Sequence, residues 1–78
     1  PNPFNPITSI DIEVPNNGMF NISVYDLNGR IVDEVFNGTK SIGSHSFSWD
    51  ASSFSSGIYF VNLSNNKFSK YHKIMLIK

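Results

Sequence analysis

Two acidic side chains near the start of the 78-residue sequence have the types and spacing that paired-carboxylate chemistry uses. Asp11 and Glu13 lie two positions apart on an alternating stretch, so their carboxylates point to the same side about 6.5–7 Å apart. Glycosidases and calcium sites use pairs at such distances. The sequence has no Asp-x-Asp-x-Asp-Gly calcium loop, and two acids on the polar face of a strand are ordinarily solvated. We therefore interpret the pair as part of a hydrated surface.

Histidine and serine do not form a second reactive set. His45 and His72 are the only histidines and the sequence has no cysteine, whereas a catalytic zinc ion typically needs three protein ligands. His45 alternates in phase with Phe47 and Trp49, which predicts a partly buried strand residue. No serine stands in the Gly-x-Ser-x-Gly elbow of hydrolases. We expect no catalytic residue, no metal site and no cofactor, and hence no enzyme.

The large aromatic residues have two conceivable uses. Trp49, Tyr59 and Phe60 could form a platform for sugars or single-stranded nucleic acid. A chain of 78 residues, however, has to bury nearly all of its large rings to offset the entropy lost on folding. We therefore place the rings inside and predict a structural core that includes Trp49, Phe47, Val24 and Ile22.

Charge divides the chain into two parts although the formal net charge is zero. Residues 1–50 hold all six acids and two cations, which leaves four negative charges. Residues 51–78 hold no acid and the four remaining cations, Lys67, Lys70, Lys73 and Lys78. Pairing of a basic last strand with acidic neighbouring strands is the preferred explanation, and the alternative is a basic address that a partner reads. The lysines are too sparse for a nucleic-acid footprint.

Apolar and polar residues alternate with a period of two, which predicts strands. Six predicted strands are separated by turn residues, over about residues 8–14, 20–24, 30–36, 45–49, 58–63 and 68–77. The stretch 58–63 is nearly continuous in apolar character, as expected for a central strand covered on both faces. Pro15 to Gly18 predicts a hairpin between the first two strands, and Asn65 with Asn66 predicts one between the last two. Six to seven short strands without a helical pattern predict an all-β fold, an immunoglobulin-like antiparallel β-sandwich.

The remaining segments are predicted as connections. Pro-Asn-Pro-Phe-Asn-Pro at residues 1–6 predicts an extended entry linker, so that the domain itself covers residues 7–78. Residues 39–44 are predicted to form a polar loop. No apolar run approaches the ~20 residues that a membrane-spanning helix needs, so we expect no transmembrane segment.

Two local features have a predicted geometry. A three-residue loop with Gly29 in the left-handed conformation places Asp26 opposite Arg30, and it also places Val24 opposite Val32. We therefore expect Asp26, Gly29 and Arg30 to form a structural turn pair. Tyr59 follows a glycine at the start of a late strand, which predicts a tyrosine corner whose hydroxyl bonds to the backbone of the upstream serine-rich turn.

Five blocks of this sequence, taken in order, resemble the type A C-terminal sorting domain of the type IX secretion system. They are Pro-Asn-Pro-Phe-Asn-Pro at 1–6, Val-Tyr-Asp-Leu-Asn-Gly-Arg-Ile-Val at 24–32, Trp-Asp-Ala-Ser at 49–52, Ser-Gly-Ile-Tyr-Phe at 56–60 and Lys-Ile-Met-Leu-Ile-Lys at 73–78. The immunoglobulin-like domain of the flagellar hook-capping protein shares much of this pattern. Two alternatives therefore stay open beside sorting: a hook-capping-type assembly domain, and a passive or carbohydrate-binding accessory module of a secreted enzyme.

The resemblance implies a specific role. Such domains end larger secreted proteins, which cross the periplasm and then the outer membrane for release or attachment at the cell surface. The implied partners are the secretion machinery, a surface sortase-like peptidase and a covalently linked upstream cargo. By motif match, the residues implied in recognition are Gly57 and Tyr59 with the terminal segment Lys73, Ile74, Met75, Leu76, Ile77 and Lys78.

A physical mechanism can be attached to this role as a hypothesis. The last strand combines lysines with an apolar run. It could detach, or it could present its edge so that a receptor pairs with it by strand addition.

Overall fold

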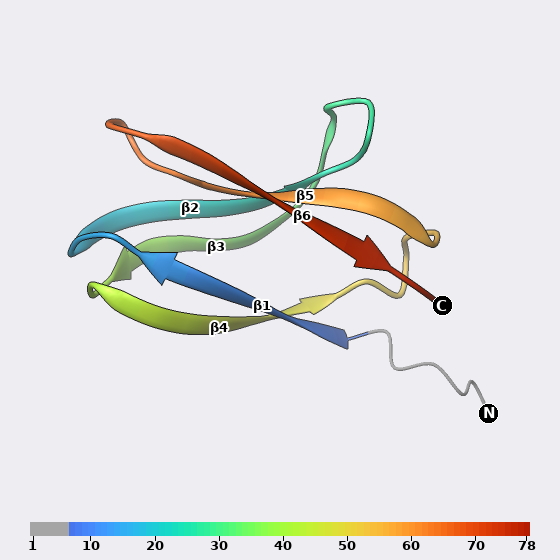
Figure 1. Ribbon diagram of the computed structural model, residues 1–78, viewed down its shortest axis with the longest axis horizontal. Coiled ribbons are helices and arrows are strands. Elements are labelled where there is room, and N and C mark those ends of the chain that lie inside the picture. Colours follow the sequence, from blue (N-terminus) through green and yellow to red (C-terminus); the bar gives the residue numbers. More distant parts are fainter. Residues whose placement is uncertain (1–6) are drawn as a thin grey trace.

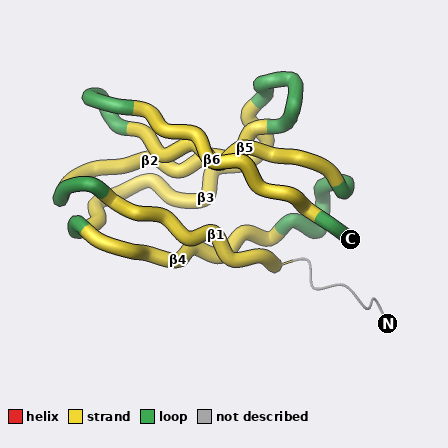
Figure 2. Tube along the Cα trace, in the orientation of Figure 1, coloured by secondary structure: helices red, strands yellow, loops and turns green. Residues whose placement is uncertain are grey.

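The computed structural model describes residues 7–78, which contain strands and loops but no helix (Figure 2). Alternation decides where the strands form. In the first strand Ile10, Ile12 and Val14 are buried while the residues between them are exposed. The six strands are β1 (Ile7–Val14), β2 (Gly18–Tyr25), β3 (Ile31–Lys40), β4 (Gly43–Asp50), β5 (Gly57–Ser64) and β6 (Ser69–Leu76). The predicted entry linker at residues 1–6 lies outside the described residues.

The strands form two antiparallel sheets that pack face to face (Figure 1). The smaller sheet holds β1 and β4, and the larger sheet has the order β3-β2-β5-β6. The predicted all-β, immunoglobulin-like sandwich is confirmed. β3 is longer than predicted, because Asn37 and Gly38 pair with β2 and are not turn residues. The loop expected at residues 39–44 is therefore reduced to Ser41 and Ile42.

The hairpin predicted across Pro15 to Gly18 is wrong. β1 pairs with β4, and β2 pairs with β3 and β5, so the segment between β1 and β2 carries the chain from one sheet to the other. The physical reason is that both strands have a strongly apolar face. These two faces bury more apolar surface by opposing each other across the sandwich than by lying side by side in one sheet.

The core lies between the sheets and is centred on Trp49, which is 2% exposed. The Trp49 ring stacks on Phe54, with centroids 5.4 Å apart, and meets Tyr59 edge-on at 5.6 Å. Val24 and Ile22 are completely buried, whereas Phe47 is half-buried and packs at the margin. Buried hydrophobic residues come from both sheets: Ile10, Ile12, Val14, Phe20, Ile22, Val24, Trp49, Ala51, Tyr59, Val61, Leu63 and Leu76.

The β2–β3 turn has a three-residue loop in which the backbone N–H of Asp26 donates to the Arg30 carbonyl at 2.9 Å. Gly29 has φ +81°, and the Arg30 Nε lies 3.1 Å from an Asp26 carboxylate oxygen. Beyond the loop the register differs from the prediction, because bulges in the pairing put Val24 opposite Asp33 instead of Val32. One extra residue in β3 turns the Asp33 side chain inward.

Candidate recognition surface at the terminal strand

β6 is an edge strand of the larger sheet, and β5 is its one hydrogen-bonded neighbour. Its first five residues, Ser69–Lys73, are all exposed. In the second half of the strand the side chains that face the smaller sheet are covered, since Ile74 is half-buried and Leu76 is 7% exposed. The strand therefore has an exposed basic half followed by a partly anchored apolar half.

The two motif blocks that lie apart in the sequence meet in this hairpin. Gly57 is opposite Leu76, and Tyr59 is opposite Ile74. Tyr59 is buried and its hydroxyl donates to the Ser55 carbonyl at 2.7 Å, which is the geometry of a tyrosine corner. Gly57 and Tyr59 thus set the start of β5, and β5 in turn sets the position of the terminal strand.

The terminal strand is held at both of its ends. At its start the Asn62 side-chain amide donates to the Ser69 hydroxyl at 2.7 Å. At its end the backbone N–H of Lys78 donates to the Ser56 hydroxyl at 3.0 Å, and the Lys78 ammonium donates to the Ser52 carbonyl at 2.8 Å. Between these contacts Met75 is 65% exposed, and Ile77, just beyond the strand, is 74% exposed. The candidate residues therefore divide into inward anchors and displayed side chains.

The turn at residues 51–56 is the part of this surface that sequence reasoning missed. The Asp50 carboxylate accepts the backbone N–H of Ser52 at 3.0 Å. Hydrogen bonds from Ser52 hold the pKa of Asp50 below its ordinary value, and the nearby positive charge of Lys78 acts in the same direction. The serine-rich composition signalled a turn, but nothing in the sequence indicated that Ser52 and Ser56 would bind the last residue.

Charge pairing within the sheet does not explain the lysines of β6, so the preferred sequence interpretation is wrong. β5 contains no charged residue, and Lys70 and Lys73 stand opposite Leu63 and Phe60. Within residues 7–78 the one ion pair within 4.0 Å joins Asp26 to Arg30. The acids of the chain all lie outside β5 and β6, and β5 is the strand with which β6 pairs.

Comparison with known proteins identifies the family. The family model described as the secretion system C-terminal sorting domain matches residues 1–78, the whole chain. The chain belongs to this family. No curated protein and no solved structure matches it. The domain is a C-terminal sorting signal for type IX secretion, and the match favours neither the accessory module nor the hook-capping alternative.

Family membership also indicates the activity, the partners and the export route that the sorting domain has in general terms. Sorting-signal domains are not catalytic. Their role implies an interaction with the secretion machinery, a cargo upstream, and export through the periplasm toward the cell surface or the extracellular space. The described residues include no helix long and apolar enough to cross a membrane.

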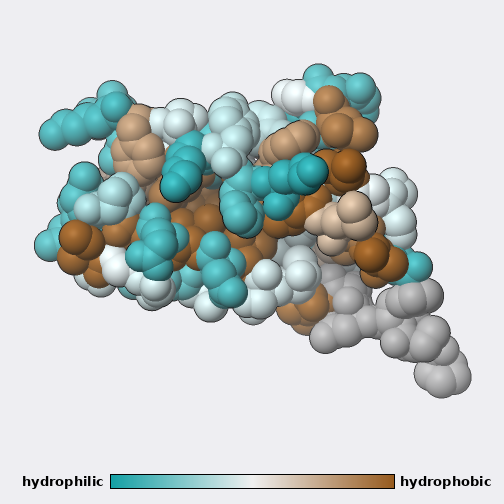
Figure 3. Space-filling view, in the orientation of Figure 1, coloured by the Kyte–Doolittle hydropathy of each residue, from teal (hydrophilic) through white to brown (hydrophobic). Residues whose placement is uncertain are grey.

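A groove in the sorting domain runs between the edge strands β1 and β6. Its volume is about 240 Å³, and its lining combines apolar residues of β1 and β5 with polar and charged residues on either side: Asp11, Ile12, Glu13, Val61, Leu63, Lys70 and His72. On this face of the molecule an apolar strip lies between hydrophilic side chains above and below it (Figure 3). The groove exists because the smaller sheet has two strands and the larger sheet four.

The paired acids of β1 belong to this surface. Asp11 accepts a hydrogen bond from the Ser46 hydroxyl at 2.6 Å, and Glu13 accepts one from Ser44. Both serines are on β4, so the carboxylates are bound to their own sheet. No group of three or more metal-ligating side chains occurs within residues 7–78. His45 is half-buried, and its ring nitrogen lies 2.7 Å from the Ser41 carbonyl oxygen.

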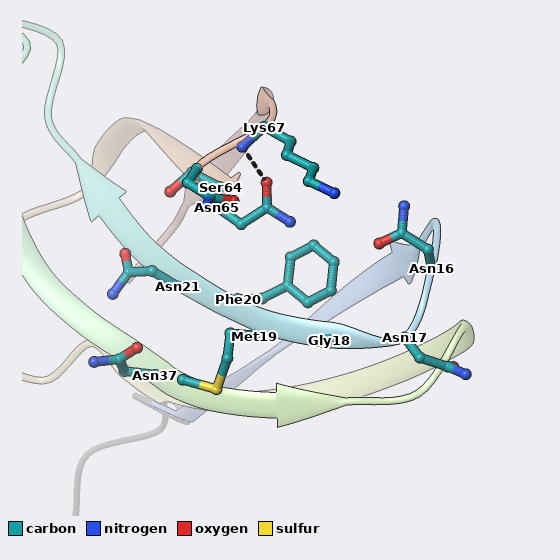
Figure 4. Close-up of a pocket in the computed structure, with 11 residues that line it drawn as sticks. Asn16, Asn17, Gly18, Met19, Phe20, Asn21, Asn37, Ser64, Asn65 and Lys67 are labelled. Carbon is teal, nitrogen blue, oxygen red and sulfur yellow. Dashed lines mark hydrogen bonds between the residues drawn. The ribbon is translucent and has the colours of Figure 1, made fainter.

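A larger hollow of about 530 Å³ lies beside the β1–β2 and β5–β6 connections of the sorting domain and is lined mainly by asparagines (Figure 4). Three of these asparagine amides form hydrogen bonds within the fold. Asn17 accepts the backbone N–H of Ile42 at 2.6 Å, Asn65 accepts that of Lys67 at 2.8 Å, and Asn21 donates to Glu34 at 2.7 Å. The hollow is therefore a product of loop geometry, and we assign no binding to it.

Some aromatic residues of the sorting domain lie in the core between the sheets, and others lie on the outer face of the larger sheet. Trp49 and Tyr59 are in the core, so they do not form an exposed platform with Phe60. Phe60 is half-buried on the outer face of the larger sheet. There Tyr25 meets the exposed Tyr71 edge-on, with ring centroids 5.8 Å apart.

Proposed function

We propose that the secretion machinery reads the displayed side of the terminal segment Lys73–Lys78, and that Gly57 and Tyr59 act as positioning residues. The observation that carries this proposal is the separation of roles along the segment. Leu76 and Lys78 are occupied by contacts within the domain, whereas Lys73, Met75 and Ile77 point away from it and are exposed. A receptor can therefore contact the second set without unfolding the domain.

The same anchors favour presentation of the strand over its detachment. Detaching the terminal strand would break its pairing with β5, the Asn62–Ser69 contact and both contacts of Lys78. It would also expose Leu76. We therefore infer that the terminal segment is recognised while it is part of the sheet.

The role of the family also suggests what happens to the cargo, and this is a further part of the proposal. A surface sortase-like peptidase separates the cargo from the sorting domain, upstream of β1, and the cargo is released or attached at the cell surface. Sequencing the first residues of the domain fragment left after secretion would locate the cut. A cut inside the sandwich would contradict this part of the proposal.

The recognition proposal is tested with a reporter cargo fused to the full chain. Deleting residues 73–78 should leave the cargo in the periplasm, but this change also removes the anchors. A second variant, Met75→Ser with Ile77→Ser, changes displayed side chains alone and should block surface delivery while the domain stays folded. The matched control is Met19→Ser, because Met19 is similarly exposed, at 60%, on β2. Normal surface delivery of the Met75/Ile77 variant would contradict the proposal.

A further inference from the structure

The lysines of β6 have no ion-pair partner within 4.0 Å among residues 7–78. Lys70 and Lys73 are exposed, and the strand opposite them presents Leu63 and Phe60. The carboxylates that line the groove beside Lys70, those of Asp11 and Glu13, are bound to serine hydroxyls on β4. The basic half of the strand thus presents positive charge without an ion-pair partner on both faces of the sheet edge, because Lys70 and Lys73 differ by an odd number of positions.

The backbone of β6 has no neighbouring strand on the side away from β5. In an antiparallel sheet alternate residues direct their N–H and C=O groups to each side, so an edge strand leaves half of them unpaired. The eight residues of β6 give an edge about 27 Å long at ~3.4 Å per residue. Next to this edge lies the groove, whose apolar floor of Ile12, Val61 and Leu63 could take side chains from an added strand.

We propose that the free edge of β6 pairs with an extended segment of the export machinery that is acidic in one half and apolar in the other. Its acidic residues stand opposite Lys70 and Lys73, and its apolar residues stand opposite Ile74, Met75 and Leu76. This inference rests on the proposed function, since it names the chemistry of the partner that reads the terminal segment. Charge complementarity fixes the acidic half of the partner segment. The apolar residues Ile74, Met75 and Leu76 along the same edge fix its apolar half.

A second copy of the chain is a poor occupant of the same edge. Two parallel β6 strands in register would set lysine opposite lysine. Two antiparallel strands that overlap completely would set Lys70 opposite Met75 and Lys73 opposite His72. Neither arrangement supplies a carboxylate to the lysines, which is how edge lysines prevent self-association.

The cellular test reverses the charge on the reporter fusion. Lys70→Glu with Lys73→Glu should lower the rate of surface delivery about tenfold, because two attractive cross-strand pairs become repulsive. Lys70→Arg with Lys73→Arg keeps the charge and should be delivered normally. Lys67→Glu makes the same kind of change in the adjacent turn and is the matched position control. All three variants should remain folded, which urea denaturation checks, since these side chains are exposed.

The outcomes separate this inference from the proposed function. Normal delivery of the double-Glu variant, together with failure of the Met75/Ile77 variant, would refute pairing with an acidic partner segment. The proposal that the machinery reads the terminal segment would still hold. Normal delivery of both would contradict both. A double-Glu variant that self-associates but is delivered normally would show that the lysines act only against aggregation, which also overturns the inference.

A binding test with a defined probe checks the pairing itself. The probe is the synthetic peptide Val-Ile-Val-Ile-Glu-Thr-Tyr-Glu, written to run antiparallel to β6 with its glutamates opposite Lys73 and Lys70. Added to the 78-residue chain, it should shift the backbone amide resonances of β6 and slow their hydrogen exchange, while β3, the other edge, stays unchanged. The same peptide with lysine in place of glutamate should bind about tenfold more weakly. Equal binding of the two peptides, or equal effects at β3, would overturn the inference.

Discussion

The indole Nε1 of Trp49 donates a 2.9 Å hydrogen bond to the carboxylate Oδ2 of Asp33. Trp49 is on β4 in the smaller sheet, and Asp33 is on β3 in the larger sheet, so this contact ties the two layers together. A buried indole N–H needs an acceptor. The displaced register of β3 provides one by turning Asp33 inward opposite Val24.

We expect Asp33→Ala to lower the free energy of unfolding by about 1–3 kcal/mol, because it leaves the buried indole donor without a partner. Asp33→Asn keeps an acceptor oxygen and should lose much less. Urea denaturation followed by tryptophan fluorescence measures both. Equal stability of the alanine variant and the parent would mean that the contact contributes nothing.

Removing the tyrosine-corner hydrogen bond should lower the free energy of unfolding by less than Asp33→Ala does. Tyr59→Phe keeps the buried ring but deletes the hydrogen bond to the Ser55 carbonyl, and we expect a loss of about 0.5–1.5 kcal/mol. Tyr71→Phe is the matched control, since Tyr71 is 59% exposed. The two variants should be separable by their urea midpoints, and identical midpoints would argue against a stabilising corner.

Gly29 is the position where backbone conformation alone should decide stability. Its φ of +81° is left-handed, and a Cβ added there would meet no atom within 4 Å. Gly29→Ala should therefore cost roughly 1–2 kcal/mol from backbone strain without any steric clash. Gly29→Asn should cost less, because asparagine tolerates this conformation. Thermal unfolding of the two variants gives the order, and the reverse order would refute this explanation.

The same turn should make stability depend on acid. The backbone N–H of Arg30 is the main cause that holds the pKa of Asp26 below its ordinary value, with help from the Asn28 N–H and the Arg30 guanidinium. A lowered folded-state pKa adds stability above the unfolded value of about 3.9, and this stability is lost as pH falls through the folded value. Carbon-detected NMR titration of Asp26 should show the low pKa. Asp26→Asn should reduce the loss of stability between about pH 5 and about pH 2, a range that includes the unfolded-state pKa of about 3.9.

The strands were predictable from the sequence because a period of two marks β1, β2 and β4, and a nearly continuous apolar run marks β5. Ile10, Ile12 and Val14 alternate with polar residues, and the structure buries these three residues. The sheet to which each strand belongs was not predictable in this way. Pro15 to Gly18 has the composition of a hairpin turn, and composition alone does not distinguish a turn within one sheet from a crossing between two sheets.

The candidate site was predictable in part for a similar reason. The motif blocks located Gly57, Tyr59 and the terminal segment, but their cross-strand register follows from the hairpin at Asn65. The bulge that brings Asp33 to Trp49 left no local signal, since an extra residue in a strand changes the facing of side chains without changing their types. The lysines of β6 were expected to meet acids, and strand order decided otherwise.

The pairing of β1 with β4 has a kinetic consequence. The β2–β3 and β5–β6 hairpins join neighbours in the sequence, whereas β1 has to wait for a strand that follows both β2 and β3. Non-local pairing of this kind slows the folding of small β proteins into the millisecond-to-second range. We expect the smaller sheet to close late, so that the inner faces of β2 and β5 stay wet until β4 arrives. A newly made domain would then show its terminal hairpin before it becomes a closed sandwich.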